Sequence, residues 1–167
     1  MIVILLKLSS KLQLHSVDDG LQKQIFHFGN GSEPQGIDPH IVTGVPEHHI
    51  LISLCEGLTI PNAFDDENLP GAAESWSVSD DGKIYIFKLR KNGRWSNGDP
   101  VTAEDFVWSW QRILTASLGS QYPDMLYYLE GAQEYHTGLT DDFSSVGVKA
   151  LDSHTLEVKL KAPTPFC

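Results

Sequence analysis

The sequence predicts an α+β fold in which helices pack on a mixed, mostly antiparallel sheet. Three segments carry this prediction: two alternating strands joined by a tight turn over 74–89, a capped amphipathic helix over 102–114, and a second pair of alternating strands over 146–160. Strands joined by tight turns pair antiparallel, and helices between such pairs are typical of α+β proteins. The coarse order of elements is β-α-β-β-α-α-β-β.

The composition excludes several classes of protein. A chain of 167 residues with 41% hydrophobic and 20% charged residues is long and apolar enough to form a globular domain with a core. The formal net charge of -10 argues against a nucleic-acid surface, because phosphate binding needs clustered Lys and Arg. The acidic residues are scattered along the chain, which does not indicate a dedicated cation site.

The two cysteines and the N-terminus give little functional information. Cys55 lies inside an apolar helical pattern and is predicted to be a buried thiol, and Cys167 is the last residue. This pair forms neither a disulfide framework nor a zinc site, and we expect no cofactor. The apolar run at the N-terminus is too short for a membrane helix and short even for a signal peptide, so the sequence does not establish export by itself.

Residues 1–23 form a poorly specified N-terminal lead, a segment whose pattern predicts no definite helix or strand, and the first elements follow it. A strand is expected over 24–28, and the Gly- and Pro-rich loop that follows lacks the Gly-Lys-Ser/Thr of a phosphate loop. A helix is expected to begin at Pro46 and end at Gly57. Its predicted buried face consists of Ile50, Leu51, Leu54 and Leu58. His48 and His49 are adjacent and point to different sides of this helix, so they do not form a metal pair.

The central hairpin and helix have the clearest local signals. After an acidic, turn-rich connection over 61–71, strands are expected over 74–78 and 84–89, with a turn at 79–82. Thr102 is placed to cap a helix with Asp105 as its acidic N3 partner. The buried stripe of this helix is predicted to contain Phe106, Val107, Trp110, Ile113 and Leu114.

The remaining elements are weaker. A helix is predicted over 124–134 through Met125, Leu126, Leu129 and Ala132. Val146, Val148 and Ala150 are expected on one strand, and Leu156, Val158 and Leu160 on the next, with Glu157 and Lys159 facing outward.

No segment carries a catalytic motif. The sequence contains no nucleophile elbow, zincin motif or phosphate loop, so we do not expect an enzyme. One residue does indicate ligand contact. Tyr122 lies in a loop before Pro123, where a regular core does not dictate the side chain. A loop tyrosine offers a flat apolar face and a hydroxyl to a ligand.

A series of short motifs resembles the peptide-binding solute receptors of ABC importers, most closely the oligopeptide-binding subgroup. In chain order they are Asn30–Gln35, Asp38–His40, Gly44–Glu47, Glu56–Leu58, Pro70–Trp76, Ser79–Gly82, Phe87–Lys91, Trp95–Val107, Ser109–Arg112 and Gly147–Asp152. The similarity runs from about Phe26 to Phe166 with the motifs in the same order.

The resemblance implies capture of short peptides and their delivery to the permease subunits of an ABC transporter in the membrane. It implies a monomer in the periplasm or on the outer face of the cell membrane. Family members close two lobes on the ligand, in the type II, cluster C form of the periplasmic-binding-protein-like fold. By resemblance, residues 24–44 start the first-lobe core and residues 45–167 form its small inserted subdomain. The second lobe has no counterpart in this sequence, so we expect weak peptide binding and an exposed sheet edge near Phe28.

The resemblance also implies a ligand site at Thr43, Gly44, Val45 and Tyr122. The segment Thr43–Val45 matches the part of the family that lies along the peptide backbone, where Val45 would offer main-chain hydrogen bonds. Thr43 replaces an acidic residue that is frequent in the oligopeptide subgroup, which argues against a preference for basic peptides there. Trp95 and Asp105 match a structural signature of the family and not its ligand contacts.

Two other functions remain open. One is a receptor of the same family for a non-peptide ligand such as nickel, heme or a sugar, which the departure at Thr43 allows. The other is a stand-alone interaction or enzymatic domain.

Overall fold

The structure is a computed structural model that describes residues 23–24, 29–65 and 67–164. The chain divides into two units, residues 1–33 and 34–167. In the first unit, Gln24 lies in a turn with a φ of 54°, so it does not begin a strand there. The rest of the strand predicted over 24–28, with the sheet edge expected near Phe28, lies outside the described residues.

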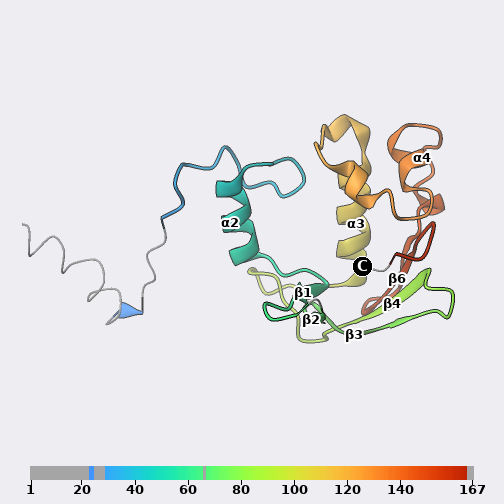
Figure 1. Ribbon diagram of the computed structural model, residues 1–167, viewed down its shortest axis with the longest axis horizontal. Coiled ribbons are helices and arrows are strands. Elements are labelled where there is room, and N and C mark those ends of the chain that lie inside the picture. The colour runs from blue at the N-terminus through green and yellow to red at the C-terminus, as the bar shows by residue number, and fades with distance from the viewer. Residues whose placement is uncertain (1–22, 25–28, 66, 165–167) are drawn as a thin grey trace, which may run out of the picture. The chain divides into compact units, whose positions relative to one another are not determined.

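The second unit contains a four-stranded antiparallel sheet in the order β3-β4-β6-β5 (Figure 1). The strands are β3 (Ala73–Val78), β4 (Ile84–Leu89), β5 (Val148–Asp152) and β6 (Thr155–Lys159). Two hairpins, β3-β4 and β5-β6, meet where β4 pairs with β6, with Tyr85 opposite Val158. The predicted hairpins and the antiparallel character of the sheet are therefore confirmed.

The core lies between this sheet and α3 (Ala103–Leu114). Figure 1 shows α3 and α4 on the same side of the sheet. Leu114 and Leu156 are fully buried, and burying each leucine stabilises the fold by about 1.5–3 kcal/mol. The other predicted stripe residues, Phe106, Val107, Trp110 and Ile113, are partly buried and pack against this core. The period of 3.6 residues thus identified the correct face of α3.

The start of α3 depends on one carboxylate. Oδ2 of Asp105 accepts hydrogen bonds from the backbone N–H of Thr102 at 2.7 Å and from its hydroxyl at 3.1 Å. The same oxygen accepts a hydrogen bond from the indole N–H of Trp95 at 3.3 Å. Asp105 therefore joins the turn before α3 to the first turn of the helix.

The helix predicted over 124–134 is wrong. The structure has a 3-10 helix, η2 (Pro123–Leu126), and a short helix, α4 (Ala132–His136), separated by an irregular segment. The backbone N–H of Glu130 donates to the carbonyl of Lys159 at 3.0 Å, and the carbonyl of Glu130 accepts from the N–H of Gly147 at 2.8 Å. These bonds to the end of the sheet replace helical ones, and Gly131 then turns the chain with a φ of 68°.

Helix α2 (Val45–Leu54) begins one residue before the predicted Pro46 and ends before Gly57. Its predicted buried face is only partly correct, because Leu54 is 72% exposed. The prediction of a buried Cys55 thiol is also wrong. Cys55 leaves the helix in an extended conformation with a φ of -118°, and its side chain is exposed. Apolar residues occur around the whole of α2, so the periodicity does not define a single inner face.

A second, two-stranded sheet forms where only a connection was expected. Strands β1 (Thr59–Pro61) and β2 (Asn68–Pro70) pair antiparallel, with Ile60 opposite Leu69. Each strand has three residues and ends in proline, so neither shows the alternation that identifies a strand from sequence. The remaining elements are the 3-10 helices η1 (Ala116–Leu118) and η3 (Phe143–Ser145).

We expect Asp105→Ala to destabilise the protein more than Glu104→Ala. Loss of the Asp105 carboxylate removes the bonds to Thr102 and Trp95, which should cost about 1–2 kcal/mol. Glu104 is exposed in the same helical turn and contributes only to the helix dipole, so its removal should cost about 0.3–0.5 kcal/mol. Urea unfolding of both variants measures the difference, and equal losses would contradict the role of Asp105.

Gly131→Ala should be more damaging than Gly138→Ala. Both glycines have a positive φ, 68° and 77°, which costs any other residue about 1–2 kcal/mol. At Gly131 an added Cβ would also overlap the carbonyl oxygen of Ser145, whereas nothing lies within 4 Å at Gly138. Overlap in a packed site adds about 1–3 kcal/mol. Denaturant unfolding compares the two, and a loss at Gly138 as large as that at Gly131 would rule out the steric explanation.

Candidate ligand-binding site

The segment that precedes α2 is fixed to α3 by an ion pair. The two carboxylate oxygens of Asp38 accept hydrogen bonds from the guanidinium of Arg112, at 2.8 Å to Oδ1 and 2.6 Å to Oδ2. The two side chains are 35% and 29% exposed, so the pair is only partly screened by solvent. Bidentate pairing of this kind fixes orientation as well as distance.

His40 extends this contact to a second residue of α3. Its Nδ1 accepts a hydrogen bond from Nη1 of Arg112 at 2.7 Å, and its Nε2 lies 2.9 Å from the hydroxyl oxygen of Ser109. Because arginine can only donate, Nδ1 must be unprotonated, so the ring is neutral with its proton on Nε2. We call the four residues Asp38, His40, Ser109 and Arg112 the clasp.

The pKa values in the clasp agree with this assignment. Burial lowers the pKa of His40 below its ordinary 6.5, and the positive charge of Arg112 lowers it further, against the opposing effect of Asp38. The hydrogen bonds from Arg112 lower the pKa of Asp38 to about 2, although partial burial opposes the change. At neutral pH the clasp therefore consists of an ionised carboxylate, a guanidinium and a neutral imidazole.

The clasp is followed by Thr43 and Gly44, which lead into α2 at Val45. Gly44 has a φ of -83° and a ψ of 154°, and its carbonyl accepts the first helical bond from the N–H of His48 at 3.0 Å. The carboxylate of Glu47 folds back against Gly44 and accepts a bond from the backbone N–H of Gln35 at 2.6 Å. A β-carbon at position 44 would overlap that carboxylate, so any other residue there would displace the side chain of the buried Glu47.

All four residues predicted as ligand contacts line one cavity of about 410 Å³. Thr43, Gly44 and Val45 form one wall, and Tyr122 reaches it from the loop before η2. Val45 is 66% and Tyr122 52% exposed, so both side chains present apolar surface to solvent. The structure therefore brings together residues from two separate parts of the sequence. Their role in binding stays a prediction.

The sequence analysis missed the other residues that line this cavity, which are Pro39, Val42, His48 and Leu51. His48 was considered only as a metal ligand, yet its spacing of three from Val45 on α2 placed both on one helix face. The clasp had no local signal, because Asp38 and Arg112 are 74 residues apart. Across the described residues, no three His, Cys, Asp or Glu side chains gather closely enough to hold a metal ion.

None of the helices in the described part of the chain is both long enough and apolar enough to cross a bilayer.

Comparison with known proteins identifies the family. The sequence profile described as bacterial extracellular solute-binding proteins, family 5 Middle, matches residues 68–166. The chain belongs to this family. The match confirms the resemblance found from the motifs, and it places the protein among solute-binding proteins, a family named for binding solutes and not for catalysis.

Individual relatives agree with this assignment. The chain is 45% identical to the periplasmic oligopeptide-binding protein OppA of Escherichia coli strain K12. The aligned region has 147 residues and covers 87% of the chain. It is 38% identical over 146 residues, 86% of the chain and 27% of the relative, to the probable deoxycholate-binding periplasmic protein YgiS of the same strain. The crystal structure of Haemophilus influenzae OppA in complex with RPPGFSPFR superposes with a TM-score of 0.76 at 41% identity over 82% of this chain.

The similar region is a fraction of these proteins. The chain spans 26% of the length of the Escherichia coli OppA and 27% of the solved Haemophilus influenzae chain. The predicted α+β fold, as part of a lobe of this binding-protein fold, is confirmed by the structural match. The division into a first-lobe core over 24–44 and an inserted subdomain over 45–167 stays a prediction.

We expect the free energy of unfolding to fall as the pH is lowered from about 7.5 to 5, with a contribution from His40. The pKa of His40 is lowered in the folded state, so the unfolded chain binds this proton more tightly. The contribution is present above the ordinary pKa of 6.5 and is lost as the pH falls through the folded pKa. The contribution of Asp38 has the same sign and is lost between 3.8 and about 2.

Urea unfolding over this pH range measures the effect in the parent and in His40→Gln, which lacks the titrating ring. The stability of His40→Gln should depend less on pH than that of the parent. His154→Gln removes a histidine outside the clasp and should leave the His40 contribution in place. An unchanged pH dependence in His40→Gln would show that the clasp does not require a neutral histidine.

Proposed function

We propose that this chain forms a peptide-contacting wall of an extracytoplasmic receptor that binds short peptides for an ABC importer. The observation that carries the proposal is the segment Thr43–Val45 at the start of α2, whose backbone has unused hydrogen-bonding groups beside a cavity.

The backbone groups of this segment can be counted within the part of the chain that the structure describes. There, no group bonds to the N–H or carbonyl of Thr43, or to the N–H of Gly44 or Val45, while the carbonyl of Gly44 is used by His48. An extended peptide can bond to such groups as a neighbouring strand does. These bonds do not depend on the peptide sequence, as a receptor for varied peptides requires.

The side chains around the segment support the same proposal. Val45 and Tyr122 are both more than half exposed, and a ligand lying between them would cover apolar surface now in contact with water. The phenol of Tyr122 can stack on a peptide plane and donate a hydrogen bond. The lining of the cavity contains neither a carboxylate nor a lysine or arginine, so it offers no charge that would select basic peptides.

The remaining parts of the proposal concern the whole receptor. We propose that it acts as a monomer in the periplasm or at the outer face of the cell membrane and passes peptide to the permease subunits. The described residues supply one wall of the site, without the enclosure that contributes much of such affinity. Peptide binding to this chain should therefore be weak.

A second candidate is binding of an amphipathic non-peptide solute. One relative is described as probably deoxycholate-binding, and the cavity has apolar lining residues at Pro39, Val42 and Leu51. A sterol-like ligand would use this apolar surface but would need few of the free backbone groups of Thr43–Val45.

Titration of the ¹⁵N-labelled chain with Ala-Ala-Ala, followed by NMR, distinguishes these candidates. We expect the amide signals of Thr43, Gly44 and Val45 to shift with weak but saturable binding. Tyr122→Ala should weaken binding about fivefold to tenfold, because it removes an aromatic contact at the site. The matched control is Tyr128→Ala. Tyr128 is 61% exposed and does not line the cavity beside Thr43–Val45.

The absence of any shift in these amides would contradict peptide binding at this site. Equal loss of affinity in Tyr122→Ala and Tyr128→Ala would remove Tyr122 from it. Shifts with deoxycholate and none with the peptide would favour the second candidate.

A further inference from the structure

A second cavity of about 310 Å³ adjoins the first. The two share Pro39, Val42 and Tyr122, so Tyr122 stands at the boundary between them. The second cavity is open to solvent on one side and is lined by the segment Pro39–Val42, by α3 and by the chain from Ser120 to Leu126. Its volume is at the lower end of the range of about 300–1,000 Å³ that is usual for ligand pockets.

The lining of this second cavity is mainly apolar. It contains Ile41, Val42, Trp110, Ile113, Met125 and Leu126. Three of the polar residues in the wall already form hydrogen bonds: His40 with Ser109 and Arg112, and the amide nitrogen of Gln121 with the carbonyl of Gly119 at 3.1 Å. No side chain of the lining carries a formal charge when His40 is neutral. A charged guest would lose hydration there without gaining a counter-charge.

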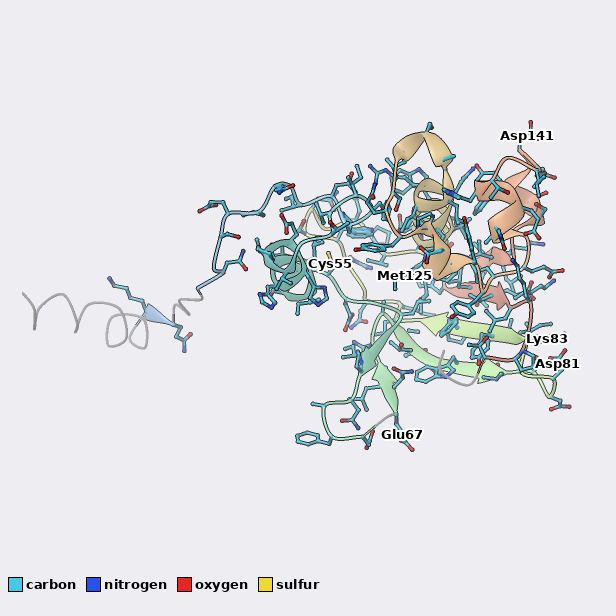
Figure 2. All side chains as sticks on the ribbon, turned by 45° about the horizontal axis from the view of Figure 1, so that its top comes forward. Cys55, Glu67, Asp81, Lys83, Met125 and Asp141 are labelled. Atoms are coloured by element: carbon cyan, nitrogen blue, oxygen red, sulfur yellow. The ribbon has the colours of Figure 1, made fainter. Side chains whose placement is uncertain are left out.

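Two of the apolar side chains stand at the opening of the cavity. Met125 is 70% and Ile41 42% exposed, and Figure 2 shows Met125 beside α3. Methionine is flexible and polarisable, so it can adapt to guests of different shapes. A guest that entered would cover both side chains.

The cavity is also preformed. The hydrogen bond between His40 and Ser109 at 2.9 Å fixes the segment Pro39–Val42 to α3, and both elements line the cavity. A preformed pocket binds without the entropy loss of ordering its walls.

We propose that this second cavity is a side-chain pocket that accepts a large apolar residue of a bound peptide. The inference rests on the proposed function, in which the peptide backbone lies along Thr43–Val45. Side chains of an extended peptide alternate between two sides, so one residue can enter the cavity while its neighbours point away. Tyr122 would separate this side chain from the backbone site. The pocket selects aromatic and long aliphatic residues against charged ones.

The first test uses the parent chain and single amino-acid probes in place of peptides. The chain contains two methionines, so ¹³C labelling of the methionine methyl groups gives few signals, and Met125→Leu assigns that of Met125. N-acetyl-L-phenylalaninamide should shift the Met125 methyl signal saturably, whereas N-acetyl-L-lysinamide should not. No shift with the phenylalanine probe, or equal shifts with both, would overturn the pocket.

The second test measures selectivity among peptides. Ala-Phe-Ala should bind at least about fivefold more tightly than Ala-Ala-Ala, and Ala-Asp-Ala more weakly. Met125→Glu should bring the ratio between the phenylalanine and alanine peptides close to one. Leu139→Glu is the matched control, since Leu139 is 80% exposed and lines neither cavity. It should retain the parent ratio. Thermal unfolding followed by circular dichroism checks that both variants are folded.

The two proposals fail in different ways. In one outcome, peptides shift the amide signals of Thr43–Val45, but Ala-Phe-Ala binds no more tightly than Ala-Ala-Ala and the Met125 methyl signal does not shift. The pocket is then overturned and the peptide site stands. If the phenylalanine probe shifts Met125 but no peptide shifts those amides, the assignment of both cavities to a peptide is overturned.

Discussion

The ion pair between Asp38 and Arg112 determines the geometry of the whole candidate site. Both cavities have the segment Pro39–Val42 as one wall and residues of α3 or the loop after it as another. The bidentate contact, at 2.6 and 2.8 Å, fixes one wall to the other, and the hydrogen bonds of His40 to Arg112 and Ser109 support it. The guanidinium also lies 6.0 Å from the ring centroid of Trp108, which restricts its freedom further. A partly exposed salt bridge contributes little to stability by itself, so its importance here is positional.

The accuracy of the sequence predictions follows the range of the interactions involved. Strand β4 and helix α3 were predicted well because alternation, the helical period and the Asp105 cap are all local patterns. The segment after η2 was predicted wrongly because its backbone bonds to Lys159 and Gly147, which are remote in sequence. The apolar spacing of that segment was real, but tertiary hydrogen bonds outweighed it.

The candidate site shows the same difference between local patterns, which the sequence reveals, and contacts between remote residues, which it does not. Composition and spacing indicated only Tyr122, whereas Thr43–Val45 came from the resemblance to a family. Asp38–His40 and Ser109–Arg112 were noted only as motifs of the resemblance, and their contact in the clasp could not be predicted because 74 residues separate Asp38 from Arg112. The cavity next to Met125 was missed for a related reason. Met125 was assigned to a helix face, and the absence of that helix left its side chain at the opening of a pocket.

The distribution of charge separates two steps of recognition. The chain has a formal net charge of -10, yet the described lining of both cavities contains no Asp or Glu. A diffuse negative field attracts cationic solutes and raises their rate of encounter, and salt screens this effect. Selection inside a neutral cavity depends instead on main-chain bonding, shape and desolvation, which salt affects much less. In the proposed receptor, the acidic surface therefore influences how fast a peptide arrives, while the backbone at Thr43–Val45 and the apolar pocket determine which peptide stays.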